Sequence, residues 1–265
     1  MAQTLHRPKR RVTPVCGFHY VKLVYRALLL FAGVYLYVAF RIWDATPPDY
    51  FPTLMRCGLL LIWLVYAAEM ICRFFPSKLE SPGCQKQFRR NFKPTGETTP
   101  VLPARRGTVT VALVWLALNG TIAALYFTHV IDVGILLLVS LAYGVCDMIC
   151  ILFFCPFQMW FMKNRCCTTC RIYNWDFAMM FTPLLLIPHL YTWSLLAMSL
   201  GILARWEITL RRHPERFSEA TNACLSCKNC DEKLCLHKRH ILRLVKQVKQ
   251  VKDTVKDTIK EKIKK

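Results

Sequence analysis

Long apolar segments are the feature that most constrains how this chain folds. Four segments of roughly 18–22 residues each contain few charged side chains. They run from 21 to 40, 54 to 72, 108 to 127 and 133 to 154. At 1.5 Å per residue, each can cross a hydrocarbon core about 30 Å thick. A soluble domain would instead distribute its apolar residues in short periodic patches. The sequence therefore predicts an all-α integral membrane protein, a bundle of membrane helices.

A fifth apolar stretch, from 172 to 210, is too long for a single crossing. As one helix its 39 residues would extend about 58 Å. Pro183 and Pro188 interrupt the stretch, and a proline removes a backbone donor and breaks a helix. We expect two antiparallel spans, 172–187 and 190–208, which brings the total to six. A single crossing here, and five spans in all, is the alternative.

Basic residues alternate between the connections of the predicted spans. The net charge of the chain is +20. Lys and Arg gather in 1–26, 73–107 and 156–171, whereas acidic residues outnumber them in 41–53 and 128–132. Because Lys and Arg accumulate in cytoplasmic loops, we expect a multi-pass protein of the cell membrane with both termini in the cytoplasm. This topology explains the basic charge, so no nucleic-acid partner is expected.

Two clusters of cysteines flank the last predicted pair of spans. The first, in the motif CCTTC, consists of Cys166, Cys167 and Cys170. The second, in CLSCKNCDEKLC and just after it, consists of Cys224, Cys227, Cys230, Cys235 and His237. Two antiparallel spans begin and end side by side, so we expect both clusters to meet on the cytoplasmic side. Cytoplasmic thiols are kept reduced, and closely spaced reduced cysteines bind soft metals.

The spacing of the cysteines leaves two kinds of metal centre open. Zinc takes four sulfur or nitrogen ligands, commonly from two C-x2-C pairs, which Cys167/Cys170 and Cys227/Cys230 provide. An iron–sulfur cluster takes four thiolates, commonly in C-x2-C-x2-C-x3-C-P. The run here is C-x2-C-x2-C-x4-C without the proline. We expect one centre, zinc or iron–sulfur, with the other members of the two clusters as alternate ligands. The principal ligands are Cys166 or Cys167, Cys170, Cys227 and Cys230. Loose thiols without metal are the remaining alternative.

The fourth predicted span carries a carboxylate, Asp147. A charge in lipid is costly, so this side chain should face a partner or water. Cys146 and Cys150 are four residues apart on one adjoining helix face. They predict either a proton or metal path towards Cys155, or a carboxylate hydrogen-bonded between helices with the cysteines as small apolar fillers. Glu69, near the inner end of its span, is expected to snorkel to the membrane surface.

The same span ends in the stretch CDMICILFFCPFQ, residues 146–158. Its Cys-Pro-Phe resembles the Cys-Pro elements of membrane-bound polyferredoxins that serve respiratory reductases. The resemblance covers about a dozen residues, and it implies a redox setting for the metal centre. The full ferredoxin motifs that those proteins also carry are absent from this chain.

The C-terminal segment 239–265 has the pattern of a basic amphipathic helix. Its Val and Ile residues from 245 onwards recur with a mean spacing of 3.6 residues, the period of an α-helix. Ten basic and three acidic residues give the segment a charge of +7. Such a helix binds anionic lipid at the membrane surface. The predicted organisation is a bundle over 1–208, a cytoplasmic Cys-rich segment over 209–238 and this helix.

These features favour a membrane-anchored metal or redox module. The cysteine centre would exchange electrons with a protein partner, or sense metal or oxidant beside the bilayer. The alternative is a non-enzymatic scaffold in which zinc is structural and the basic tail binds lipid or a partner. Transport of a small solute rests on Asp147 alone. Motifs of nucleotide-binding proteins, zinc proteases and serine hydrolases are absent, so enzymatic activity stays open.

Overall fold

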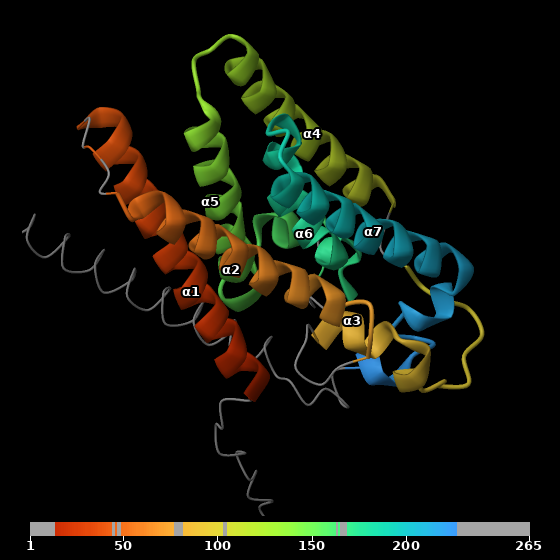
Figure 1. The fold of residues 1–265 in the computed structure, drawn as a ribbon. Helices are drawn as coiled ribbons and strands as arrows, with labels where there is room; N and C mark the ends of the chain where they lie inside the picture. Colours follow the sequence, from red (N-terminus) through yellow and green to blue (C-terminus); the bar gives the residue numbers. More distant parts are fainter. Residues whose placement is uncertain are drawn as a thin grey trace, which may run out of the picture.

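The computed structural model describes residues 14–43, 46, 49–76, 82–102, 105–162, 164 and 169–226. Figure 1 shows that this part of the chain is built of helices. The long helices are α1 (Pro14–Tyr37), α2 (Phe51–Cys72), α4 (Arg105–Phe127), α5 (Val133–Leu152) and α7 (Leu190–Arg212). Two short α-helices are α3 (Pro82–Gln87) and α6 (Asp176–Phe181). Brief π or 3₁₀ turns are η1 (Val38–Ile42), η2 (Arg89–Asn91), η3 (Phe157–Phe161), η5 (Arg171–Trp175), η6 (Thr182–Leu186), η7 (Pro214–Arg216) and η8 (Ala223–Leu225). Within the described residues the only β-type pairing is an isolated bridge between Pro94 and Asn222.

Four helices are long and apolar enough to cross a bilayer, and they coincide with the four predicted spans. They are Cys16–Arg41, Phe51–Cys72, Arg105–Phe127 and Val133–Leu152. The prediction of an all-helical chain with several candidate membrane helices is therefore confirmed for the described residues. α7 also has sufficient length, but Arg205, Glu207 and two terminal arginines make it more polar. The total of six spans goes beyond what these helices establish.

The fifth apolar stretch is broken near the two prolines, as predicted. η5, α6 and η6 follow one another as a single irregular helical limb from 171 to 186. Pro183 is the second residue of η6 and has no N–H, and the Met180 carbonyl three residues earlier accepts instead from the Ser140 hydroxyl at 2.8 Å. Ile187, before Pro188, has the extended backbone that a following proline favours. The chain then reverses and enters α7.

The long helices run alternately between two ends of the bundle. One end, which we call the base, contains the start of α1 and the ends of α2, α5 and α7. There the rings of Tyr20 and Phe153 lie 6.1 Å apart, and Arg205 Nη1 donates to the Phe74 carbonyl at 2.6 Å. At the opposite end the Tyr37 hydroxyl donates to the Asp132 carboxylate at 3.2 Å.

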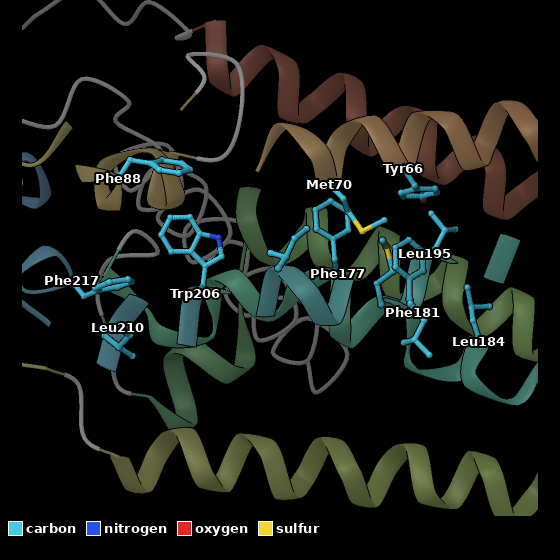
Figure 2. Close-up of a cluster of buried hydrophobic side chains, with 13 residues drawn as sticks. Tyr66, Met70, Phe88, Phe177, Phe181, Leu184, Leu195, Trp206, Leu210 and Phe217 are labelled. Carbon is cyan, nitrogen blue, oxygen red and sulfur yellow. The ribbon is translucent and has the colours of Figure 1, made fainter. Parts of the chain in front are cut away.

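The principal core lies between three elements: α2, the limb 171–186 that contains α6, and α7. It extends to the base (Figure 2). Large aromatic and aliphatic side chains form it. Its members include Tyr66, Met70, Phe88, Phe177, Phe181, Leu184, Leu195, Trp206, Leu210 and Phe217. The outer faces of the long helices instead expose leucine, valine and phenylalanine, for example Leu61 and Leu116. This distribution is expected of helices whose surroundings are lipid.

At the base, the chain after α7 folds back onto the segment between α3 and α4. Asn222 is fully buried, and its Nδ2 donates to the carbonyls of Lys86 at 3.1 Å and Arg216 at 2.9 Å. The Ala223 amide donates to the Lys93 carbonyl at 2.8 Å. Residues 213–226 are therefore fixed to the bundle. The predicted amphipathic helix 239–265 lies outside the described residues.

Candidate functional site

Arg26, near the middle of α1, is the most deeply buried charged residue of the described part. Its side chain is 2% exposed. Nη1 donates to Asp147 Oδ2 at 2.9 Å and to the Gly144 carbonyl at 3.0 Å, and both acceptors lie on α5. Nη2 donates to Glu69 Oε2 on α2 at 3.0 Å. One guanidinium therefore joins three helices, α1, α2 and α5.

A second arginine, Arg73 at the end of α2, makes a separate pair. Its two terminal nitrogens donate to the two carboxylate oxygens of Asp176 at 2.6 and 2.5 Å. The guanidinium also lies over the Phe177 ring, 4.4 Å from its centroid. Both members of the pair are buried. This two-pronged geometry is the strongest form of carboxylate recognition by arginine, and it joins α2 to α6.

The buried charges balance. Lys22 adds a third cation, with its Nζ 3.4 Å from Glu69 Oε2. The positive residues are Lys22, Arg26 and Arg73, and the negative residues are Glu69, Asp147 and Asp176. Three charges of each sign sum to zero, which avoids the cost of an uncompensated charge in a medium of low dielectric constant. We call these six side chains the ion-pair cluster.

The ion-pair cluster tests several sequence predictions. Asp147, which we expected to face a partner or water, contacts Arg26 of α1. Counting Lys22 and Arg26 among the charges of the N-terminal connection was wrong, because both are buried within α1. Glu69 does not snorkel to a surface, since Arg26 and Lys22 hold it in the interior. A local hydropathy pattern does not show which way a charged side chain turns.

Sequence reasoning missed Arg26, Arg73 and Asp176 as parts of one site. Two signals were present. Lys22 and Arg26 are four residues apart, and so are Glu69 and Arg73. Side chains at this spacing lie on one face of a helix. Two basic residues on one face of an apolar segment, together with an acidic and a basic residue on another, indicate helices that pair through buried charges.

A cavity of about 310 Å³ adjoins the ion-pair cluster on the side of the base. Asp147 and Asp176 line it, and so do sulfur-containing side chains. The sulfur-containing side chains are Cys146, Cys150, Cys155, Cys170, Met179 and Met180. We call this space the sulfur-lined cavity. The structure thus brings Cys170 of the first predicted cluster to the cysteines that precede and follow the end of α5.

A larger cavity, of about 510 Å³, lies towards the opposite end between α1, α2, α5 and α7. Leucine, isoleucine and aromatic side chains form most of its lining, and we call it the apolar cavity. Met180 lines both this cavity and the sulfur-lined one. Tyr66, another lining residue, has its ring 5.5 Å from the Arg26 guanidinium carbon. The ion-pair cluster therefore lies where the two cavities approach each other.

A third cavity, of about 260 Å³, lies within the base. Glu207 of α7 accepts from Arg171 Nη2 at 2.6 Å and from Trp175 Nε1 at 2.9 Å in its wall. Cys170 lines this cavity as well as the sulfur-lined one. The Arg171–Glu207 pair joins the residues just after the first cysteine cluster to α7.

Of the eight predicted metal ligands, the described residues include Cys170 and Cys224. Cys170 is buried against Val111 and Ile172. Cys224 lies at the base, where its Sγ is 3.0 Å from the Asn91 carbonyl. The other predicted ligands lie outside the described residues: Cys166, Cys167, Cys227, Cys230, Cys235 and His237. Within the described part, no three side chains of His, Cys, Asp or Glu are grouped so that they could hold a metal ion.

The segments that carry the two cysteine clusters nevertheless reach neighbouring residues. Asn174, four residues after Cys170, donates from Nδ2 to Gln87 Oε1 at 3.0 Å. Asn222, two residues before Cys224, donates to the Lys86 carbonyl at 3.1 Å. Both clusters therefore adjoin segments attached to one short stretch at the base.

Comparison with protein-family models, with curated proteins and with solved structures found no match. The resemblance of residues 146–158 to polyferredoxins has no support from these comparisons. The function is therefore inferred from the residues and their geometry.

Proposed function

We propose that the protein is a multi-pass membrane protein that carries a cysteine-ligated metal centre at its cytoplasmic face. The observation that carries this proposal is the attachment of Asn174 and Asn222 to the adjacent residues Gln87 and Lys86. The first cysteine cluster ends four residues before Asn174, and the second begins two residues after Asn222. The two clusters are far apart in the sequence. A single centre with ligands from both clusters needs this proximity.

The proposed topology has six crossings, with the base and both termini in the cytoplasm. The limb from 171 to 186 consists of five 3₁₀, six α and five 3₁₀ residues. At about 2.0 Å per 3₁₀ residue and 1.5 Å per α residue, its length is about 29 Å. A limb of only 16 residues can therefore reach across a hydrocarbon core of about 30 Å. Its buried Asp176 is neutralised by Arg73.

We favour two ligands from each cysteine cluster. Cys170 is packed among apolar side chains, so Cys166 and Cys167 are the better donors from the first cluster. Cys227 and Cys230 are the better donors from the second, with Cys235 and His237 as alternates. Zinc would make the centre structural or metal-sensing, whereas an iron–sulfur cluster would carry electrons to a protein partner.

Metal content and the visible spectrum of the anaerobically purified protein test this proposal. A broad absorption near ~400 nm with iron and sulfide is expected for an iron–sulfur cluster, and a colourless protein with stoichiometric zinc for the alternative. Cys227→Ser should remove the metal. Cys57→Ser, at an exposed thiol of α2, is the matched control and should retain it. Unchanged metal content in Cys227→Ser, Cys230→Ser and Cys167→Ser proteins would exclude a shared centre.

Topology is tested with single-cysteine variants and a membrane-impermeant thiol reagent in intact cells. A cysteine at position 227 should be protected from the reagent until the cells are opened. A cysteine placed at Val130, in the exposed turn between α4 and α5, should react from outside. Labelling of position 227 in intact cells would indicate five crossings and would separate the two clusters.

A second candidate function, a scaffold attached to lipid, is favoured by the attachment of residues 213–226 to the base. The basic segment 239–265 would then begin close to the membrane surface, where each basic residue contributes about 1 kcal/mol on anionic lipid. A peptide of residues 239–265 should gain helical circular dichroism on anionic vesicles, and high salt should reduce the gain. Equal helicity on neutral vesicles would remove the electrostatic basis of this function.

A further inference from the structure

The sulfur-lined cavity concentrates sulfur atoms outside the proposed cytoplasmic centre. Six sulfur-containing side chains line a space of about 310 Å³. They come from different parts of the chain: the end of α5, the turn after it, the residue before η5, and α6. Only the tertiary structure brings them together. Soft thiolate and thioether ligands favour Cu(I), zinc and iron–sulfur clusters, and Cu(I) is the one of these that two thiolates can hold.

The pair Cys150 and Cys155 is the centre of this arrangement. α5 ends at Leu152, and the amides of Phe153 and Phe154 both donate to the Ile149 carbonyl, at 2.8 and 3.2 Å. This tight reversal turns Cys155 back towards the helix that it follows. Cys150 and Cys155 lie on either side of this turn, and both line the sulfur-lined cavity. Two thiols that border one cavity across a tight turn need little movement to bind one small ion between them.

A backbone donor is aimed at one of these sulfur atoms. The Gln158 amide donates to Cys155 Sγ at 3.4 Å. An N–H group directed at sulfur stabilises the thiolate, which is the form that binds metal. The cavity also has Met179 and Met180 in its wall, and a thioether can complete the coordination of Cu(I) without adding charge.

The charges around the cavity disfavour hard metal ions. Asp147 and Asp176 are the carboxylates of the lining. Arg26 and Arg73 already pair with them, at 2.9 Å and 2.5 Å respectively. Ca²⁺ and Mg²⁺ require several free oxygen ligands, which the two paired carboxylates do not offer. The sulfur atoms are therefore the ligands that the cavity presents.

We propose that the sulfur-lined cavity binds one Cu(I) ion between the thiolates of Cys150 and Cys155. On binding, two S–H bonds break, two Cu–S bonds form, and two protons leave to solvent. No electron is transferred. Cu(I) accepts a pair of thiolates as ligands, so a group of three is not required. This site is separate from the proposed cytoplasmic centre and shares none of its favoured ligands.

The test uses the full-length protein in detergent, reduced and freed of metal. Six substitutions, at Cys166, Cys167, Cys224, Cys227, Cys230 and Cys235, each to Ser, first remove the thiols of the two cysteine clusters other than Cys170 from competition. Cu(I) is then added against a chromophoric Cu(I) chelator. We expect one equivalent of Cu(I) to be retained per chain, with only sulfur neighbours in the X-ray absorption spectrum of copper.

Further substitutions on this background locate the ion. Cys150→Ser and Cys155→Ala should each abolish retention of Cu(I), whereas Cys72→Ser, at an exposed thiol of α2 outside the cavity, should retain the full equivalent. Thermal unfolding of each apo variant shows whether the bundle is preserved. Two results overturn the proposal: a background protein that retains no Cu(I), and a folded Cys150→Ser protein that retains the full equivalent. Neither result bears on metal at the cytoplasmic centre, which is measured through Cys227.

Discussion

The half of the bundle near the base and the half near the opposite end are held together by different interactions. Near the base, Arg26 and Arg73 join α1, α2, α5 and α6 through buried ion pairs. Aromatic rings add to these contacts, such as Trp206 with Phe88 at 5.1 Å. Towards the opposite end the helices surround the apolar cavity of about 510 Å³. There Tyr37 and Asp132 make a partly buried polar contact.

In the opposite half, glycines allow α1 and α5 to approach each other closely. A Cβ atom added at Gly134 would lie 2.6 Å from the Tyr37 ring, and one at Gly33 would lie 3.1 Å from Leu138. Between helices in lipid, apolar burial gives little driving force, so close packing and polar contacts decide association. The comparison teaches that one half of this bundle specifies its partners by charge and the other by shape.

The largest effect is expected from removing Arg26. Arg26→Met leaves both Glu69 and Asp147 without their shared partner, and stranding a buried charge costs about 3–5 kcal/mol. We expect a loss at the upper end of this range in the free energy of unfolding, measured in lipid bicelles. Arg56→Met, at an exposed position of α2, should change it by about 0.5 kcal/mol or less. Similar losses for the two variants would mean that the buried cluster does not hold the base half together.

A smaller loss is expected at Arg73, because both of its terminal nitrogens pair with the same carboxylate, that of Asp176. Arg73→Met alone should cost about 3 kcal/mol by leaving Asp176 unpaired. The double variant Arg73→Met/Asp176→Leu should recover most of this loss, since replacing both members of a buried pair is often neutral. A double-mutant cycle on unfolding free energies measures the coupling. Arg26→Met/Asp147→Leu should recover less of the lost free energy of unfolding. In this double variant Glu69 still lacks its contact with Arg26 and keeps only that with Lys22 among the two. Equal recovery in both pairs would contradict the distinction between the two arginines.

In the opposite half, adding a single methyl group should change the free energy of unfolding measurably. Gly134→Ala places a Cβ against the Tyr37 ring, and this crowding should lower the free energy of unfolding by about 1 kcal/mol. Gly120→Ala has no neighbour within 4 Å and should raise it by about 0.5–1 kcal/mol through helix propensity. We therefore expect the free energy of unfolding to change in opposite directions in the two variants. A stabilising Gly134→Ala would show that shape does not hold α1 to α5.

The smallest effect is expected from the polar contact of the opposite half. Tyr37→Phe removes the donor to Asp132, which still accepts from the Ile135 amide at 2.9 Å and lies 3.5 Å from Arg41. Loss of one hydrogen bond should cost about 0.5–1 kcal/mol. Tyr35→Phe, at an exposed ring of α1, is the matched control in the same unfolding assay. A cost above that of Arg73→Met would reverse the ranking of the two halves.

Much of the fold could be predicted from the sequence. The four apolar segments became helices, and Pro183 and Pro188 broke the fifth stretch near the predicted position. Length, hydropathy and proline are local properties of the chain, so they need no knowledge of neighbours. The candidate site was less predictable. Asp147 could be recognised because a carboxylate in an apolar helix requires a partner, but the sequence did not identify Arg26 as that partner.

The sequence by itself determined which segments are helical, where the longest apolar stretch breaks and which residues have thiols or charges to offer. The tertiary structure alone decided that Arg26 contacts Asp147 and Glu69, and that Cys155 lines the same cavity as Cys150. The physical reason is that helix formation depends on backbone hydrogen bonds and composition along one segment. The partner of a side chain depends instead on how each helix is rotated about its axis and how its neighbours pack, which no single segment contains.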